Sequence, residues 1–147
     1  MFIRRAERAN DPWSGHIALP GGRREARDAD LLATAVRETR EEVGVRLPAR
    51  ALLGALADLS PRATGLPPLS IRPFVFGLPA RPPARVSDEV AAVIWLPLAG
   101  LRERAATAVV TVGKSELRVP CFKAGGIVIW GLTYRILTGV LPLVLQG

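Results

Sequence analysis

The stretch RETREEVGV, residues 37–45, brings Glu38, Glu41 and Glu42 close together. In a helix these positions are i, i+3 and i+4, so the three carboxylates share one face. Like charges at that spacing cost a helix roughly a few tenths of a kcal/mol per pair. A divalent cation would turn the repulsion into attraction, and Mg²⁺ prefers oxygen ligands of this kind. The stretch therefore predicts a helix that carries a cation site.

The flanking residues extend this helix to about residues 29–43. Apolar residues recur through it at helical spacing and predict a face packed on the core. Asp28 or Asp30 can cap the first turn, and Gly44 follows where the helix end needs left-handed geometry. On this register the glutamates lie beside the apolar face, at the rim of the core.

Three acids on a helix are also typical of a solvated surface, and Arg37 with Glu41 forms an i, i+4 ion pair of that kind. The neighbouring glycines favour the cation site. Gly21 and Gly22 precede the helix, where a tight loop can bring a backbone carbonyl toward the same ion, and Gly44 closes the helix directly after the acids.

The rest of the chain predicts one α/β (α+β) domain over all 147 residues. Short apolar runs predict strands at residues 2–3, 16–19, 51–58, 69–78, 90–96, 109–112 and 116–121. Residues 98–106 predict a short helix, and the C-terminal residues 127–145 predict mostly helix that starts at Trp130 or Gly131. Residues 60–68 and 81–87 predict loops rich in proline.

The net charge of +7 indicates an anionic partner. The arginines are scattered, and no recognition helix or RNA-binding aromatic motif is present, so we expect a phosphate-bearing small molecule and not a nucleic acid. The single cysteine, Cys121, predicts a packed thiol. The sequence has no signal peptide and no uninterrupted apolar run long enough to span a membrane, so we expect a cytoplasmic protein.

The glycines and acids together resemble the Nudix box, as Gly22…Arg37-Glu38-x-x-Glu41-Glu42-x-Gly44. The spacing is one residue longer than usual, and an aspartate replaces a common glutamate at position 28. Both departures resemble the coenzyme A pyrophosphatase-like branch of the Nudix family. The segments SGHIALPGG at residues 14–22, SDEV with WLPL in residues 87–98, and IWGLT at residues 129–133 are also similar to that branch.

The resemblance implies a mixed β-sheet sandwiched between helices, with the box as a loop–helix–loop. It implies Mg²⁺ or Mn²⁺ and hydrolysis of a diphosphate bond. By this resemblance Glu38 and Glu42 bind the metal, Glu41 binds it or orients the attacking water, and the carbonyl of Gly22 is a further ligand. Arg37 would hold the glutamates in register.

The proton acceptor for the attacking water differs among family members. Glu41 is the first choice here, and Glu89, in a loop outside the box, is the second.

The residues that would contact substrate carry two interpretations each. Trp13 would stack on adenine or pack in its loop, and Arg23 and Arg24 would contact phosphates or lie in solvent. His16 is expected to be a hydrogen-bonded structural residue, and Trp95 and Trp130 to belong to the core.

The substrate expected first is coenzyme A or an acyl-coenzyme A. In that branch an arginine is usual where Asp11 stands, and a phenylalanine where Leu19 stands. An ADP-ribose or NADH pyrophosphatase, or a non-catalytic nucleotide-binding module, therefore stays as an alternative.

Family members usually have more residues before this point of the fold. Only Phe2 and Ile3 are left for the first strand, so we expect either a true start upstream of this one or a shortened edge strand. An exposed edge can recruit a second chain, which favours a homodimer.

Overall fold

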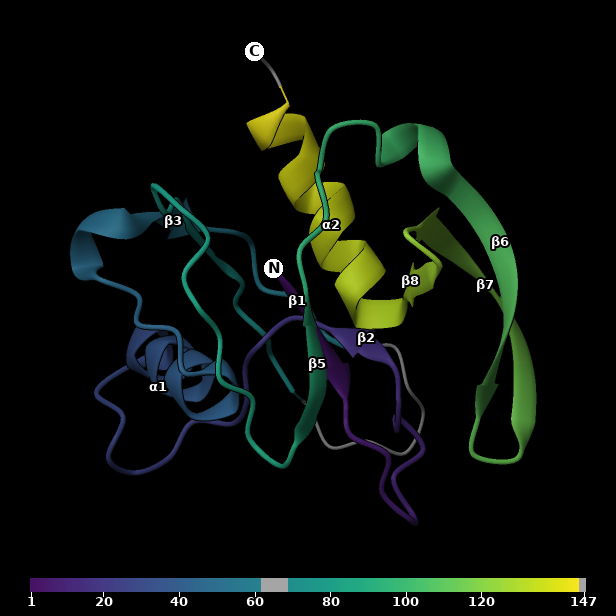
Figure 1. The fold of residues 1–147 in the computed structure, drawn as a ribbon, viewed down its shortest axis with the longest axis horizontal. Helices are drawn as coiled ribbons and strands as arrows, with labels where there is room; N and C mark the ends of the chain where they lie inside the picture. Colours follow the sequence, from purple (N-terminus) through teal and green to yellow (C-terminus); the bar gives the residue numbers. More distant parts are fainter. Residues whose placement is uncertain (62–68, 146–147) are drawn as a thin grey trace.

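The computed structural model describes residues 1–61 and 69–145. Within these residues the chain forms two α-helices and eight strands, arranged as Figure 1 shows. The strands are β1 (Phe2–Arg5), β2 (Ile17–Ala18), β3 (Leu52–Ala55), β4 (Phe74–Phe76), β5 (Val90–Ile94), β6 (Ala105–Val112), β7 (Ser115–Ala124) and β8 (Ile127–Trp130). The helices are α1 (Leu31–Val43) and α2 (Gly131–Val144), with 3₁₀ turns at Ala49–Ala51 and Arg102–Arg104.

The strands form three sheets, in the orders β2-β1-β5, β3-β4 and β6-β7-β8. Every described pairing is antiparallel, so the described strands do not form the single mixed sheet that was expected. The α/β class itself is confirmed. Strand β1 pairs on both sides, with β2 and β5, and the prediction of an exposed edge at β1 is therefore wrong.

Strand β1 separates two apolar clusters because successive side chains point to opposite faces. Phe2 packs into the cluster that contains Leu137 and Leu141 of α2. Ile3 packs into the cluster that contains Val43 of α1. Figure 1 shows α1 and α2 on opposite sides of the β1–β5 pair, so the sheet lies between the two helices as the resemblance implied.

Outside α1, the predicted elements differ from the observed ones mainly in where they begin and end. The expected strands at 51–58 and 69–78 shorten to β3 and β4, and residues 62–68 of the expected loop lie outside the described residues. The predicted hairpin around Gly113 is confirmed and is longer than expected, with register pairs from Ala105↔Phe122 to Val112↔Ser115. The short helix expected at 98–106 is wrong, because this pairing draws Ala105 and Ala106 into β6 and leaves only a 3₁₀ turn.

The C-terminal residues confirm a helix from Gly131, which follows strand β8. Cys121 is fully buried, as expected of a packed thiol. In the part of the chain that the structure describes, the helices are too short or too polar to cross a membrane.

Candidate functional site

Helix α1 places the box glutamates beside the loop that precedes it. Asp30 caps the helix, and its carboxylate accepts a hydrogen bond from the backbone N–H of Ala33 at 2.7 Å. Gly44 ends the helix in the left-handed region, with φ of 69°. The helix begins at Leu31, so its predicted position and both of its end signals are confirmed.

Glu42 is buried, with 8% of its surface exposed, and its carboxylate accepts a hydrogen bond from the Gly21 N–H at 2.9 Å. Among the described residues it makes no ion pair. Burial raises the pKa of Glu42 to about 7; the Gly21 hydrogen bond opposes this shift, and the charges of Glu38 and Glu89 add to it. A buried carboxylate without a counter-ion is a position that a cation would stabilise.

Gly22 lies directly against the Glu38 carboxylate. A Cβ at position 22 would overlap that carboxylate, so the observed position of the Glu38 carboxylate requires glycine here. The Glu38 side chain is 17% exposed, and one of its oxygens lies 2.9 Å from the Arg37 guanidinium. The loop and the helix therefore meet at the two carboxylates of Glu38 and Glu42.

Arg37 is the centre of a charged network that ties the loop to the helix. Its guanidinium donates to Asp28 at 2.9 and 3.0 Å and to the Arg23 carbonyl at 3.0 Å. On the helix it pairs with Glu38 at 2.9 Å and Glu41 at 2.8 Å. Its hydrogen bonds hold the pKa of Asp28 well below the usual range, and Asp28 in turn raises the pKa of Arg37. These contacts support the positioning role predicted for Arg37.

Asp28 is the buried anchor of this network, a role that the sequence analysis did not assign. It also accepts hydrogen bonds from the Thr34 hydroxyl and the Glu25 N–H, each at 2.9 Å. The sequence feature that pointed to Asp28 was its place in the box, where it was considered with Asp30 as a possible helix cap. Because Asp30 caps the helix, Asp28 is free to turn inward.

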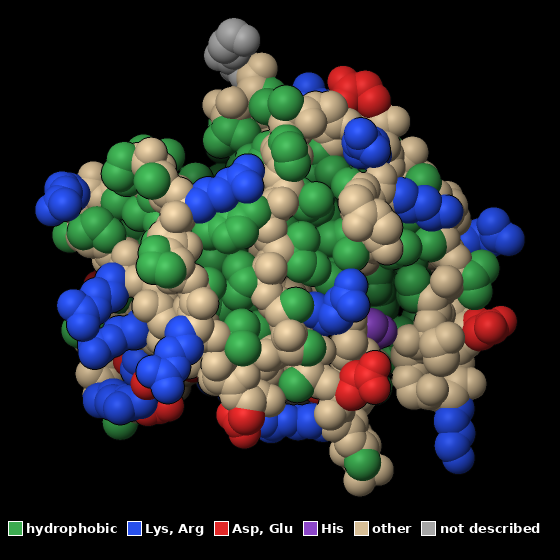
Figure 2. All heavy atoms as spheres, in the orientation of Figure 1, with side chains coloured by type: hydrophobic (Ala, Val, Ile, Leu, Met, Phe, Trp, Pro, Cys, Tyr) green, Lys and Arg blue, Asp and Glu red, His purple; other side chains and the backbone are tan. Residues whose placement is uncertain are grey.

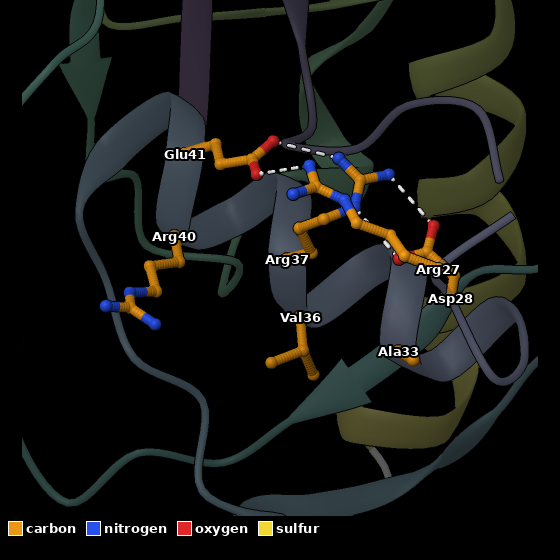
Figure 3. Close-up of a pocket in the computed structure, with 7 residues that line it drawn as sticks. All are labelled: Arg27, Asp28, Ala33, Val36, Arg37, Arg40 and Glu41. Carbon is orange, nitrogen blue, oxygen red and sulfur yellow. Dashed lines mark hydrogen bonds and ion pairs between the residues drawn. The ribbon is translucent and has the colours of Figure 1, made fainter. Parts of the chain in front are cut away.

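Glu41 is half exposed and points toward two guanidinium groups (Figure 3). It accepts hydrogen bonds from Arg37 at 2.8 Å and from Arg27 at 3.0 Å. These residues border a hollow of about 660 Å³ on α1, to which Ala33 and Val36 also contribute. Glu41 therefore lies at the open side of the network, where solvent can reach it.

Glu89 is brought to the box by contacts of the backbone. The Ser87 N–H donates to the Glu42 carbonyl and the Arg85 N–H to the Val43 carbonyl, both at 2.9 Å. Glu89 follows this attachment directly, and its charge acts on the Glu42 carboxylate. The structure thus places both candidate proton acceptors, Glu41 and Glu89, around the same end of the helix.

The arginines of the loop divide into two kinds. Arg24 donates to the carbonyls of Asp28 and Ala29 at 3.1 and 3.0 Å, so it braces the loop. The Arg23 side chain is exposed, and only its carbonyl contacts Arg37. Basic and acidic side chains gather over α1, at the lower left of Figure 2. A contact of Arg23 or Arg24 with phosphate stays a prediction.

Trp13 belongs to an aromatic group with His16 and Trp130. The Trp13 ring is 6.0 Å from His16 and 5.9 Å from Trp130, and the His16 and Trp130 rings are 5.1 Å apart, between centroids. Trp13 is 41% exposed, and Trp130 and Trp95 are partly exposed, so the assignment of both to the buried core is wrong. His16 Nδ1 has no hydrogen-bond partner among the described residues, while a backbone hydrogen bond with Thr111 acts on the imidazole, in keeping with the expectation for His16.

The oxygens of Glu38, Glu42 and the Gly22 carbonyl suit Mg²⁺ or Mn²⁺. In the described residues, three or more acidic, histidine or cysteine side chains do not gather at one point. Glu38 and Glu42 meet the loop, and Glu41 pairs with Arg37 and Arg27. The buried Glu42 without a counter-ion is the feature that fits a bound cation.

Residues 1–112 match the family model described as NUDIX domain, and the chain belongs to this family. The match includes the box, both candidate proton acceptors and the central strand β1. It confirms the family that the sequence resemblance indicated.

The chain is also similar to curated relatives. It is 31% identical to the human mitochondrial coenzyme A diphosphatase NUDT8 over 161 residues, which cover 100% of this chain and 63% of that protein. It is 42% identical to the uncharacterized protein C14C4.10c of Schizosaccharomyces pombe over 106 residues, which cover 69% of this chain and 32% of that protein. The uncharacterized Nudix hydrolase NudL of Salmonella newport is 39% identical over 87 residues, which cover 58% of this chain and 43% of that protein. The chain spans about a third to under two thirds of these relatives' lengths. The likeness to the human protein confirms the predicted resemblance to that branch.

The first prediction concerns the anchor of the network. Asp28→Asn should lower the Tm by about 5–10 °C, because it leaves the Arg37 guanidinium facing a neutral amide. The matched control is Asp30→Asn, which keeps a good cap and should change the Tm little. Thermal unfolding followed by circular dichroism measures both, and equal Tm values for the two variants would contradict the anchoring role of Asp28.

The second prediction concerns the approach of loop and helix. Gly22→Ala should weaken Mg²⁺ binding about 10–100-fold with little change in Tm, because the flexible Glu38 carboxylate moves while the backbone stays. Gly139→Ala is the control, since its Cβ would meet only Leu56 at an ordinary 3.8 Å. Isothermal titration with Mg²⁺ decides, and unchanged affinity in Gly22→Ala would remove this loop from the metal site.

The third prediction concerns pH. Folded Glu42 keeps its proton up to about pH 7, whereas the ordinary value is 4.5. The folded state binds more protons between these values, so the free energy of unfolding should fall as the pH rises across this window. Mg²⁺ requires the ionised carboxylate, so it should raise the Tm more at about pH 8 than at about pH 5.5.

The control for this pH effect is Glu42→Gln, in which His16 still titrates. Burial lowers the pKa of His16 below 6.5, which acts on stability in the opposite direction within part of the same window. The difference between the two proteins therefore reports Glu42. An equal Mg²⁺ shift at both pH values in the unchanged protein would show that Glu42 does not control metal binding.

Proposed function

We propose that this protein is a divalent-metal-dependent pyrophosphohydrolase that cleaves the diphosphate bond of a nucleoside diphosphate linked to another group. The observation that carries the proposal is the pair of Glu38 and buried Glu42 against the Gly21–Gly22 loop. Family membership and a retained set of box glutamates support catalysis over a purely binding module. Coenzyme A or an acyl-coenzyme A is the substrate that the resemblance to the human relative favours.

Within this proposal the carboxylates of Glu38 and Glu42 and the Gly22 carbonyl hold the cation. When bound, Mg²⁺ or Mn²⁺ neutralises the charge on the diphosphate and makes a water molecule a better nucleophile. Arg37 holds the carboxylates in position and does not contact substrate. Arg23 and Arg24 supply positive charge at the rim.

A carboxylate must accept the proton of the attacking water. Glu41 is the proposed acceptor, and it must work beside Arg37 and Arg27, which both contact it. Glu89 is the alternative, and the described residues include no ion pair to it. The charge of Glu89 acts on Glu42, which makes Glu89 a stronger alternative than the sequence alone indicated.

The partner and the compartment remain predictions. A homodimer is no longer supported by an open edge at β1, because that strand is central. The cytoplasmic location rests on the sequence, and the name of the human relative places that protein in mitochondria.

The fourth prediction is a hydrolysis screen with Mg²⁺ and with Mn²⁺. The substrates are coenzyme A, acetyl-coenzyme A, ADP-ribose, NADH and nucleoside triphosphates. We expect cleavage of the coenzyme A compounds, with kcat reduced about a hundredfold or more in the variant that removes the proton acceptor, Glu41→Gln or Glu89→Gln.

The control is Glu116→Gln, the same change on the exposed part of β7, which should keep full activity. Turnover of ADP-ribose or NADH instead would keep the reaction and change the substrate. If Mg²⁺ binds to the folded protein and nothing in the panel is hydrolysed, the enzymatic proposal is wrong and the binding module takes its place.

A further inference from the structure

The register of β1 and β2 places Arg5 opposite His16. Arg4 pairs with Ile17, and the Arg5 N–H donates to the His16 carbonyl at 3.0 Å. Opposite residues of antiparallel strands project from the same face. The preceding pair on that face, Ile3 and Ala18, packs with α1. Arg5 and His16 therefore lie on the α1 side of the sheet, which is also the side of the box glutamates.

Both side chains contain a buried nitrogen that lacks a partner. Arg5 Nε and His16 Nδ1 are the two buried side-chain polar atoms without a hydrogen bond in the described part of the chain. Buried polar groups are almost always satisfied, and each exception needs an explanation. These two residues are neighbours across the strand pair.

The aromatic group lies beside these nitrogens. The His16 ring contacts Trp130 edge-on at 5.1 Å and Trp13 edge-on at 6.0 Å. Trp13 is 41% exposed, so part of this large ring is open to a ligand. An exposed tryptophan beside a hydrogen-bonding group is a common way to hold a planar base.

Arg5 connects the aromatic group with the box glutamates. Its guanidinium pairs with Asp11 at 2.8 Å, and the other Asp11 oxygen accepts a hydrogen bond from the backbone N–H of Trp13 at 2.9 Å. The charge of Arg5 also acts on both His16 and Glu42. The guanidinium of Arg5 thus lies on the face that carries the acidic site and the aromatic rings. A nucleotide offers a group to each of them, with a diphosphate for a cation held at the acidic site and for the guanidinium, and a base for the rings.

We propose that Trp13, His16, Trp130 and Arg5 form the subsite for the nucleoside half of the substrate. The base stacks on the exposed Trp13 ring, which Trp130 supports from behind. The polar edge of the base satisfies His16 Nδ1, and Arg5 contacts the phosphate nearest the ribose. This inference rests on the proposed function, and it extends the sequence prediction for Trp13 to three residues that had no assigned contact with substrate.

The fifth prediction compares binding of AMP with binding of ribose 5-phosphate, which lacks the base. In calorimetric titrations of the whole chain, Trp13→Leu should weaken AMP binding about tenfold and leave ribose 5-phosphate unchanged. Trp95→Leu is the control, because Trp95 follows the other end of β5, under Arg81, and should not affect AMP binding. Equal weakening of both probes by Trp13→Leu, or no weakening of AMP, would overturn the subsite.

His16→Phe separates recognition from packing. It keeps an aromatic ring beside Trp130 and removes the unpartnered nitrogen, so the Tm should hold or rise while AMP binding weakens several-fold. A purely structural His16 would change the Tm and leave AMP affinity unchanged, and that result would overturn its role in the subsite.

The same titrations distinguish this inference from the proposed function. AMP binding that depends on Trp13 and His16, in a protein that hydrolyses no diphosphate, would support the subsite and refute the enzyme. Hydrolysis of nucleotide substrates with AMP affinity and KM unchanged in both variants would support the enzyme and refute the subsite.

Discussion

The buried ion pair between Arg37 and Asp28 is the contact on which the site depends. Bringing two charges out of water is costly, and here several hydrogen bonds from the loop and helix offset that cost. Such a pair fixes the position of the loop against the helix more than it raises the free energy of unfolding. Arg37 touches the loop through Asp28 and the Arg23 carbonyl and touches the helix through two glutamates, so the loop has one defined position against α1.

This position makes the three glutamates chemically different, although the sequence presents them as equivalent acids. Glu38 and Glu41 each contact the Arg37 guanidinium. Glu42 is buried, and within residues 1–61 and 69–145 its carboxylate accepts a hydrogen bond from the Gly21 N–H alone. Burial therefore acts on Glu42 without a compensating ion pair and raises its pKa. A cation beside Glu42 would supply the missing positive charge. The position of the loop, which buries Glu42, therefore accounts both for its raised pKa and for its fit to a cation.

The sequence predicted what short-range chemistry determines. The Asp30 cap, the Gly44 end and the hairpin around Gly113 depend on residues within a few positions, and all three appear in the structure. Features that depend on distant pairing were missed or came only from the family resemblance. The central place of β1 requires β5 and was missed, and Glu89 was named through the resemblance, because its approach to the box requires backbone hydrogen bonds from residues 85–87 to the end of α1. No local pattern encodes those contacts.

Strand β1 contributes both to the apolar core and to the sheet face that carries the candidate site. Its first two residues pack into the two apolar clusters, and its last residue, Arg5, lies on the α1 face opposite His16. The proposed metal site and the proposed base subsite are therefore joined through a strand held on both sides, not through a free loop. Changes at Trp13 or His16 can alter which base is bound without disturbing the Arg37 network, because those residues make no contact with it among the described hydrogen bonds. Specificity and hydrolysis can then evolve separately on the same sheet face.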